Sequence, residues 1–285
     1  MNNAYKNIVL TGIPRSGSSL ICSLYNDYEN SLALLEPINP FSLNTQDSMS
    51  AIEYISNFFF QMRKEVVLNN RYITHHKNNK IVSNTLEEKK IFSKNLREKI
   101  VEHGYVNTTK KLEKDFSLLI KQNAFFTALL PNLPNFFETY VVVRNPLAVL
   151  LSWNSVNLPV YNGHVPAGEK FDATLSKKLQ ETEDRLDRQI IILDWFFRQF
   201  FENIPKDHVI YYENIVSNRL EHLDALSYNS KLFTPHEILE SKNNNSSYDR
   251  NFIKILYDKI TKSMKYYQNY YSENEILELF KVLND

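Results

Sequence analysis

The chain has 285 residues, which is enough for a single α/β domain with a substantial buried core. Lysine and arginine together number 33, as do aspartate and glutamate, so the formal net charge is zero, whereas a nucleic-acid-binding protein usually carries a basic excess. Cys22 is the only cysteine, which excludes an intrachain disulfide and a cysteine-rich zinc site and is typical of the reducing cytoplasm.

The amino-terminal segment is predicted to lead directly into the fold. Residues 1–14 lack a charged segment followed by a long apolar run, so we expect no signal peptide. The β-branched apolar run 8–11 predicts a buried strand, and a glycine-containing loop separates it from a predicted helix at 18–28. A second apolar run at 31–35 predicts another strand, and Glu36 follows it directly.

The next segment, about 39–114, is predicted to be an excursion from the main sheet. Its charged stretches 46–69 and 85–103 are predicted to be helices. We expect this insert to cover the site and to contribute to the substrate pocket. His75 and His76 lie within it and are expected at the protein surface or at a helix end.

The middle of the chain is predicted to form two buried strands, at 116–120 and 139–143, with a helix at 124–130 between them. Pro146 marks the start of another helix, since proline is favoured at the first helical position, and this helix is predicted to end near residue 156. No run of about 18 apolar residues occurs here or elsewhere in the chain, so no membrane span is expected.

The last part of the chain alternates loops with regular elements. Residues 157–172 contain two prolines and two glycines and are predicted to be a loop. A long helix at 173–202 and a strand at 208–212 follow. Residues 243–247 are predicted to be a polar loop, and the chain from Arg250 onward is predicted to be mostly helical.

Together these elements predict one α/β domain over residues 1–285, with a central parallel sheet flanked by helices on both faces. In such sheets, ligands bind at the carboxyl ends of the strands. The polar motifs described next all lie at predicted strand ends, so this edge of the sheet is the expected position of the site.

The loop after the first predicted strand carries two of the chain's five glycines, Gly12 and Gly17. Their spacing is that of the phosphate-binding P-loop, except that Ser18 replaces the P-loop lysine. Inward-pointing backbone N–H groups and the positive end of the next helix still favour an anion, and Arg15 supplies positive charge. Three hydroxyl donors complete the loop: Ser16, Ser18 and Ser19. The alternative is an ordinary strand–helix turn with a serine N-cap.

A second anion-binding pattern follows the strand predicted at 139–143. Arg144 comes directly after this strand, and Ser152 lies eight residues later, about two turns into the helix that begins at Pro146. An arginine can bind phosphate with two parallel hydrogen bonds, and a serine hydroxyl adds a neutral donor. The alternative is a salt-bridged arginine and a serine in the interior of a helix.

Both patterns resemble motifs of the PAPS-dependent sulfotransferases, where PAPS is 3'-phosphoadenosine-5'-phosphosulfate. Residues 11–19 match without a gap the family's phosphosulfate loop, Pro-[Lys/Arg]-Ser-Gly-[Ser/Thr]-[Ser/Thr]. Residues 144–152 resemble its 3'-phosphate motif, Arg-[Asp/Asn]-Pro with a serine eight residues after the arginine. The resemblance spans about 8–217, apart from 39–114, and implies a P-loop NTPase-like sulfotransferase fold of the bacterial type.

The resemblance also implies the reaction. A sulfuryl group would pass from PAPS to a hydroxyl or amine of a small-molecule acceptor, such as a secondary metabolite, leaving adenosine 3',5'-bisphosphate (PAP). Sulfotransferases of this kind need no metal. The expected partner is the small-molecule acceptor. No nucleic-acid or membrane partner is expected, and the expected location is the cytoplasm.

Three residues are implied to be catalytic. Residues 119–123 occupy the place of the family's Lys-Thr-His element, but Asn123 stands where the cytosolic branch has its histidine base. Asn123 cannot accept a proton at neutral pH, so the leading base is Glu36, because bacterial and protein-tyrosine branches place a glutamate there. Lys121 matches the family's lysine and would stabilise the transferring sulfuryl group together with Arg15.

Further contacts are implied more loosely. Residues 209–215 resemble the family's Tyr-Glu-Asp-Leu strand end, which suggests a role for Tyr212. The family's late Arg-Lys-Gly element is absent, and 241–250 would replace it through Lys242, Tyr248 or Arg250. The expected donor contacts are Gly12, Pro14, Arg15, Ser16, Gly17, Ser18, Ser19, Arg144, Ser152, Tyr212 and Tyr248. The expected acceptor contacts are Glu36 and His164.

Two other functions stay open at this point. In a P-loop kinase, Ser19 would bind Mg²⁺ and Glu213 would be the acidic residue at a strand end, but the missing lysine and the Arg144/Ser152 pair count against it. A non-catalytic nucleotide-binding or partner-binding protein is the other alternative, and it would not need Glu36 or Lys121.

Overall fold

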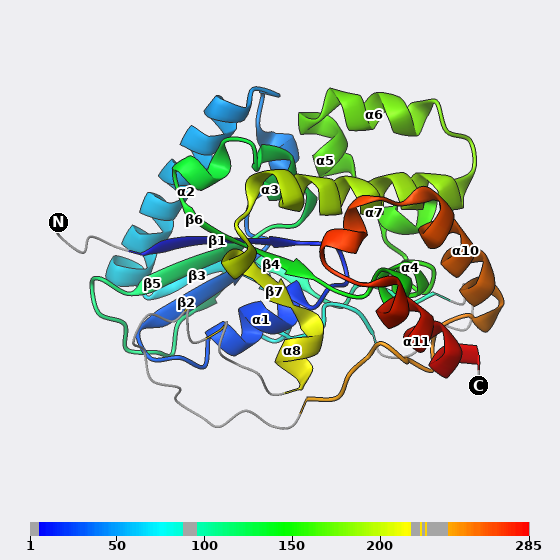
Figure 1. Cartoon of the computed structure of the whole chain (residues 1–285). Helices are drawn as coiled ribbons and strands as arrows, with labels where there is room; N and C mark the ends of the chain where they lie inside the picture. Colours follow the sequence, from blue (N-terminus) through cyan, green and yellow to red (C-terminus); the bar gives the residue numbers. More distant parts are fainter. Residues whose placement is uncertain (1–5, 88–95, 218–222, 224–225, 227–238, 285) are drawn as a thin grey trace.

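The computed structural model describes residues 6–87, 96–217, 223, 226 and 239–284 (Figure 1). Its centre is a five-stranded sheet with strand order β2-β5-β1-β6-β7, in which every neighbouring pair is parallel. The strands are β1 (Asn7–Gly12), β2 (Ser31–Leu35), β5 (Ser117–Lys121), β6 (Glu138–Val143) and β7 (Val209–Tyr211). The five predicted strands and the predicted parallel α/β architecture are confirmed.

Helices cover both faces of the sheet, so the strands are buried on both sides and are apolar almost throughout. In Figure 1, α1 and α8 lie below the sheet, whereas α2, α3 and α7 lie above it. The helices are α1 (Ser18–Tyr25), α2 (Ser48–Asn69), α3 (Ala124–Leu129), α4 (Pro146–Trp153), α5 (Pro166–Phe171), α6 (Ala173–Gln180), α7 (Arg185–Asn203), α8 (Tyr212–Val216), α10 (Ile253–Ser263) and α11 (Glu273–Asn284). None of the described helices combines the length and apolarity that a membrane span requires.

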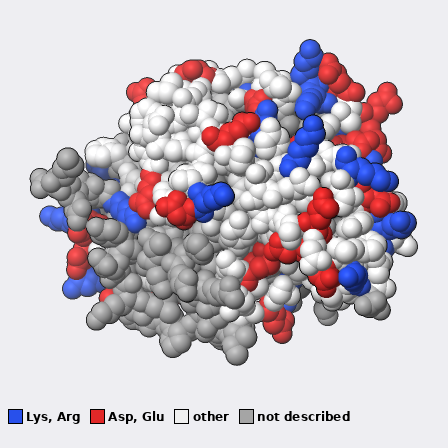
Figure 2. All heavy atoms as spheres, in the orientation of Figure 1, with Lys and Arg blue, Asp and Glu red and all other residues white. Residues whose placement is uncertain are grey.

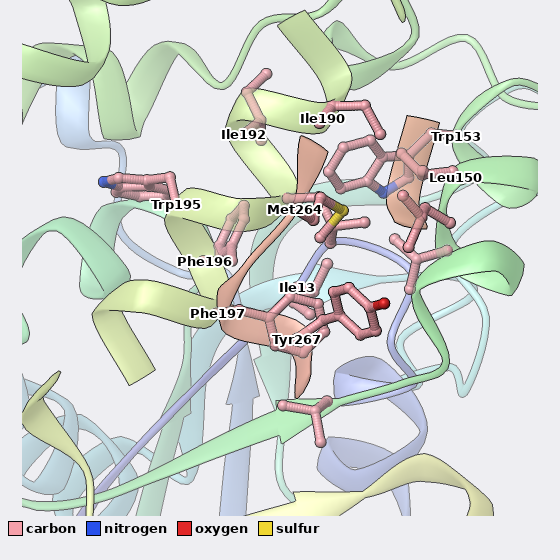
Figure 3. Packing of buried hydrophobic residues seen from close by; sticks show 14 of the residues in the cluster. Ile13, Leu150, Trp153, Ile190, Ile192, Trp195, Phe196, Phe197, Met264 and Tyr267 are labelled. Carbon is pink, nitrogen blue, oxygen red and sulfur yellow. The ribbon is translucent and has the colours of Figure 1, made fainter. Parts of the chain in front are cut away.

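Successive residues of each strand contribute to opposite faces, as the pleat requires. In β6, Val142 packs with α1, whereas Val141 and Val143 pack with α4 and α7. The latter core contains the aromatic side chains of α7, and Figure 3 shows Phe197 near Tyr267 and Phe196 on the side of Trp195. This core fixes α4, whose first residues follow the carboxyl end of β6.

The insert differs from the prediction in its second half. The helix expected at 46–69 is confirmed as α2, but the helix expected at 85–103 is wrong for the described residues 85–87 and 96–103; residues 88–95 lie outside the described part. The insert instead contains an antiparallel pair, β3 (Arg71–His76) and β4 (Glu102–Asn107). Charged residues with good helix propensity predicted a helix there, but pairing with other segments overrides that local preference: Glu102 and His103 pair with β3, Leu86 pairs with Lys99, and Arg97 pairs with Val156.

Two other expectations need correction. The loop expected at 157–172 contains α5, which begins at Pro166, a favoured first helical residue. The helix expected at 173–202 is two helices, α6 and α7. Asp184 ends the break between them by accepting a hydrogen bond from the backbone N–H of Asp187, which caps α7.

The described surface carries charges of both signs. Figure 2 shows acidic and basic side chains interspersed on the face in view, without a large patch of one sign. The equal numbers of acidic and basic residues are consistent with this distribution. Positive charge instead gathers in the pocket described next.

Candidate functional site

A pocket of about 630 Å³ lies at the carboxyl ends of the strands. This volume is within the range typical of small-molecule sites, about 300–1,000 Å³. Most of the residues singled out in the sequence line it: Pro14, Arg15, Gly17, Ser18, Ser19, Glu36, Lys121, Arg144, Ser152, Tyr212 and Tyr248. The sheet therefore brings the two predicted anion-binding motifs and the Glu36–Lys121 pair to one place.

The loop between β1 and α1 has a backbone that only certain residues adopt easily. Gly17 has φ of 92°, and a Cβ there would lie 2.6 Å from the ring of Tyr212. Arg15 has φ of 73°, in the left-handed region that is costly for residues other than glycine. The indole Nε1 of Trp153 donates to the carbonyl of Pro14 at 2.7 Å, which fixes the loop against α4.

The start of α1 provides backbone donors to the pocket. Gly17 is the N-cap and has no side chain to accept a hydrogen bond, and the first turn holds no acidic residue. The first N–H groups of a helix have no partner within the helix and carry partial positive charge. Ser18 and Ser19 line the pocket here, so these donors suit a bound anion.

Two loop residues expected to contact the donor, Gly12 and Ser16, do not line the pocket. A Cβ at Gly12 would lie 3.0 Å from the carbonyl oxygen of Val142, so glycine permits the close approach of β6. The Ser16 hydroxyl is buried and has no hydrogen-bond partner among the described residues.

Arg15 extends from the loop toward α4 and the insert. Its Nε donates to the hydroxyl of Ser152 at 3.3 Å, and its two terminal nitrogens lie 3.3 Å from the amide oxygen of Asn84. Burial, together with the nearby charges of Arg97 and Arg144, lowers the pKa of Arg15 to about 10. Among the described residues, Arg15 has no carboxylate partner.

Arg144 is buried, with only 4% of its surface exposed. Its Nε donates to Asn243 Oδ1 at 2.7 Å, its Nη1 to the carbonyl of Arg15 at 2.9 Å, and its Nη2 to Tyr248 Oη at 3.2 Å. The guanidinium also lies over the ring of Tyr212, 4.4 Å from its centroid. Within the described part of the chain no salt bridge involves Arg144, so the salt-bridged alternative has no support.

The segment proposed to replace the late family element does lie beside Arg144. The backbone N–H of Lys242 donates to Tyr212 Oη at 2.8 Å, and Tyr248 Oη donates to the carbonyl of Lys242 at 2.9 Å. Lys242 lines the pocket but Arg250 does not. Asn243 contacts Arg144 without having been predicted, because it stands in a polar loop with no motif.

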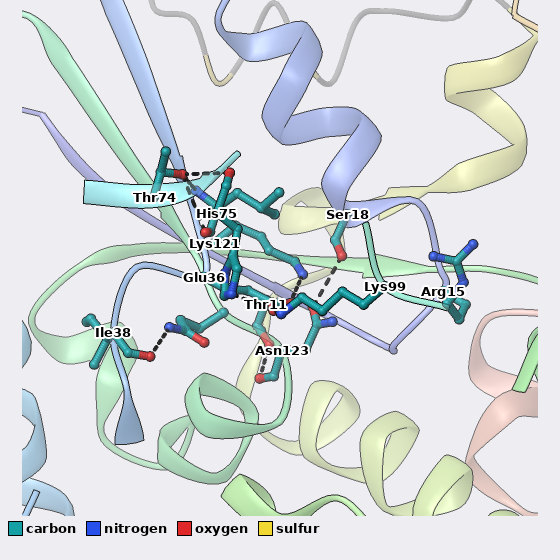
Figure 4. A network of polar contacts seen from close by, with 12 residues as sticks. Thr11, Arg15, Ser18, Glu36, Ile38, Thr74, His75, Lys99, Lys121 and Asn123 are labelled. Carbon is teal, nitrogen blue, oxygen red and sulfur yellow. Dashed lines mark hydrogen bonds and ion pairs between the residues drawn. The ribbon is translucent and has the colours of Figure 1, made fainter. Parts of the chain in front are cut away.

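Glu36 and Lys121 form an ion pair at the adjacent ends of β2 and β5 (Figure 4). Lys121 Nζ lies 2.5 Å from Glu36 Oε1; the lysine side chain is 1% exposed and the glutamate side chain 33%. Burial alone would raise the pKa of Glu36, but the charge and hydrogen bond of Lys121, with His75 and Lys99, outweigh it and lower the pKa below its usual 4.5. Glu36 is thus ionised at neutral pH.

The backbone directs Glu36 into this pair. Its φ is 47°, and its N–H donates to the carbonyl of Lys121 at 2.8 Å. A left-handed conformation in a residue other than glycine costs of order 1 kcal/mol and is often found at functional sites. The turn after β2 therefore orients the carboxylate toward β5.

His75 lies beside this pair, contrary to the expectation of a surface or helix-end role. Its Nε2 is 2.9 Å from Lys99 Nζ, and Figure 4 shows both residues next to Glu36 and Lys121. Burial and the charge of Lys99 lower the pKa of His75 to about 4. The imidazole is therefore neutral, and its Nε2 accepts a hydrogen bond from Lys99.

Asn123 connects the Lys121 strand end to the phosphate loop. The Ser18 hydroxyl donates to Asn123 Oδ1 at 3.2 Å, and the Thr11 hydroxyl donates to the Asn123 carbonyl at 2.8 Å. Asn123 lines the pocket at the position where the resemblance places a histidine, so it holds the loop but supplies no base.

His164 is not among the residues that line the pocket, so its expected contact with the acceptor finds no support. Its Nδ1 lies 3.2 Å from Glu169, and its Nε2 lies 3.3 Å from Arg188 Nη1. These contacts hold it in the segment around α5. The pocket instead contains five residues of the insert that the sequence did not reveal: Ser83, Asn84, Thr85, Arg97 and Lys99.

Comparison with protein-family models finds none that matches this chain, and comparison with curated protein sequences finds no matching relative either. Among the described residues, no group of three or more histidine, cysteine, aspartate or glutamate side chains could hold a metal ion. Function is therefore inferred from the pocket residues themselves.

Proposed function

We propose that the protein is a sulfotransferase that moves a sulfuryl group from PAPS to a hydroxyl or amine of a small molecule. The observation that carries this proposal is one pocket with three parts. These are a phosphate loop without the P-loop lysine, a buried Arg144/Ser152 pair, and an ionised Glu36 beside Lys121.

The two anion-binding parts suit a nucleotide with phosphate-type groups at both ends. The N-terminus of α1 and Arg15 would hold the phosphosulfate group, since helix N-termini and arginines both favour bound oxyanions. Arg144 and Ser152 would hold the 3'-phosphate. The Tyr212 ring under Arg144 and the Tyr248 hydroxyl beside it keep the guanidinium in place.

The transfer would break the bond between sulfur and the phosphate oxygen as the acceptor oxygen bonds to sulfur. Glu36 would take the acceptor's proton, and the negative charge that develops on the leaving oxygen would be stabilised by Arg15 and the loop N–H groups. Lys121 would neutralise the transferring group. In-line positioning would supply much of the rate, as in phosphoryl transfer.

The geometry gives less support to the kinase. Glu213, its candidate acidic residue, accepts hydrogen bonds from the Asn145 backbone, the Asn243 amide and the Tyr271 hydroxyl. It is not among the residues that line the pocket. With these three hydrogen bonds, the Glu213 carboxylate connects the ends of β6 and β7 to the segment that contacts Arg144. It therefore has a structural role.

The donor preference tests this proposal. We expect PAP to raise the melting temperature far more than AMP, ADP or ATP, because only PAP presents a phosphate to Arg144 and Ser152. We also expect transfer from labelled PAPS, in a screen of small hydroxyl and amine acceptors, to persist in excess EDTA. Equal thermal shifts with ATP and PAP, or complete and reversible loss of transfer on chelation, would overturn the proposal.

A further inference from the structure

Arg97 is a buried arginine whose hydrogen-bonding capacity is largely unused. It is 3% exposed and lines the pocket. Its Nη2 donates to the Ser155 hydroxyl at 2.8 Å, while its Nε is buried and has no hydrogen-bond partner among the described residues. An unsatisfied buried charged donor costs more than an unsatisfied neutral one, so this nitrogen points to a missing partner.

The backbone fixes Arg97 next to the end of α4. Its N–H donates to the Ser155 carbonyl at 3.0 Å, and its carbonyl accepts from the N–H of Asn157 at 2.9 Å. This parallel bridge, in which Val156 is its partner, joins the insert to the residues just after Ser152. The fold therefore fixes the backbone position of Arg97, and its side chain is not a flexible one on the surface.

Arg97 belongs electrostatically with the other two arginines of the pocket. The charges of Arg97 and Arg144 act on Arg15 to lower its pKa, and the charge of Arg144 acts on Arg97 in the same direction. Among the described residues, no salt bridge joins any of the three to a carboxylate. Three neighbouring guanidinium groups without a counter-charge repel one another, and a multiply charged anion would relieve that repulsion.

We infer that Arg97, supplied by the insert, is a second arginine of the phosphate site that Arg144 forms with Ser152, with Arg15 as the third cation close by. A dianionic phosphate monoester matches this site better than a singly charged diester, because the two charges oppose a cluster of three cations. This inference rests on the proposed function, in which the 3'-phosphate of PAP is that monoester. It adds a donor-binding residue that no motif in the sequence indicates.

Titration calorimetry with PAP and with AMP, which lacks the 3'-phosphate, tests the inference. Arg97→Gln is expected to weaken PAP binding about ten- to hundredfold, the usual effect of losing charged hydrogen bonds, and to change AMP binding less than about threefold. Arg97→Lys should fall between, since it keeps the charge but loses the planar fork. Lys99→Gln is the matched control. It removes a pocket cation two residues away, on the Glu36 side, and should weaken PAP binding less than Arg97→Gln.

Two results would overturn the inference and are distinguishable. If the wild-type protein prefers PAP to AMP and Arg97→Gln leaves that preference unchanged, the role of Arg97 fails while the proposed donor stands. If the wild-type protein shows no preference, the proposed donor fails together with the inference. Should Arg97→Gln not fold, Ser155→Ala serves instead, because it removes the side-chain hydrogen-bond partner of Arg97 without changing a residue that lines the pocket. A selective loss of PAP binding supports the inference, and unchanged PAP binding overturns it.

Discussion

Glu36 has two properties with opposite effects on its ability to act as a general base. It is ionised at neutral pH, which a base requires, but its lowered pKa makes it a weaker proton acceptor than one tuned near pH 7. Lys121 causes most of this lowering and is itself almost fully buried. The pair is therefore expected to determine the low-pH limit of activity as well as the position of the carboxylate.

The acid limb of kcat/KM tests this coupling. In the wild-type protein the limb should lie below pH 4.5, because activity is lost only when Glu36 becomes protonated. Lys121→Met should move the limb to higher pH, since burial raises the pKa of Glu36 and only the weaker effects of His75 and Lys99 then oppose it. Lys99→Met should move it less, and Glu36→Gln should abolish it along with most of the turnover. An unchanged limb in Lys121→Met would show that Glu36 is not the titrating base.

At the scale of elements, the loop between β1 and α1 depends on one glycine. Gly17→Ala is expected to destabilise the protein by about 1–3 kcal/mol, because alanine is strained at φ of 92° and its Cβ would meet the Tyr212 ring. PAP binding should weaken as well, since the loop N–H groups would shift. Urea unfolding and calorimetry measure the two effects.

Gly104→Ala is the matched control for this change. Its backbone is not in the left-handed region, and the nearest atom to an added Cβ is His76 Nε2 at 3.3 Å. We expect a change in unfolding free energy within about 0.5 kcal/mol. Equal stability losses in the two variants would show that the loop conformation is not what Gly17 provides.

The parallel sheet could be predicted because its strands are largely continuous apolar runs, and four of the five end at or just before a polar residue that lines the pocket, namely Glu36, Lys121, Arg144 or Tyr212. The pair β3-β4 could not, because polar and charged residues interrupt both strands and β4 buries only Val106. Arg97 illustrates the consequence for the site. It reaches the pocket only through pairing with Val156, and no spacing along the chain indicates that contact.

At the scale of the whole molecule, the three arginines of the pocket are expected to affect stability when no ligand is bound. Arg15 lies in a left-handed conformation, is desolvated, and is repelled by two other arginines. Arg15→Asn removes the charge, and asparagine tolerates that conformation better. In the absence of nucleotide we expect a free energy of unfolding higher by up to about 1 kcal/mol, with weaker PAP binding. Lower stability of the nucleotide-free variant would contradict this account.

Binding of the donor at the three arginines would also make the melting temperature depend on the donor concentration. Since PAPS would bind the native state and not the unfolded chain, each tenfold rise in its concentration above its Kd should add about 1.4 kcal/mol to the free energy of unfolding. In a cell that is short of the donor, the same arginines would leave more of the protein open to proteolysis. Abundance of the protein would then follow abundance of its cosubstrate, without any separate regulatory site.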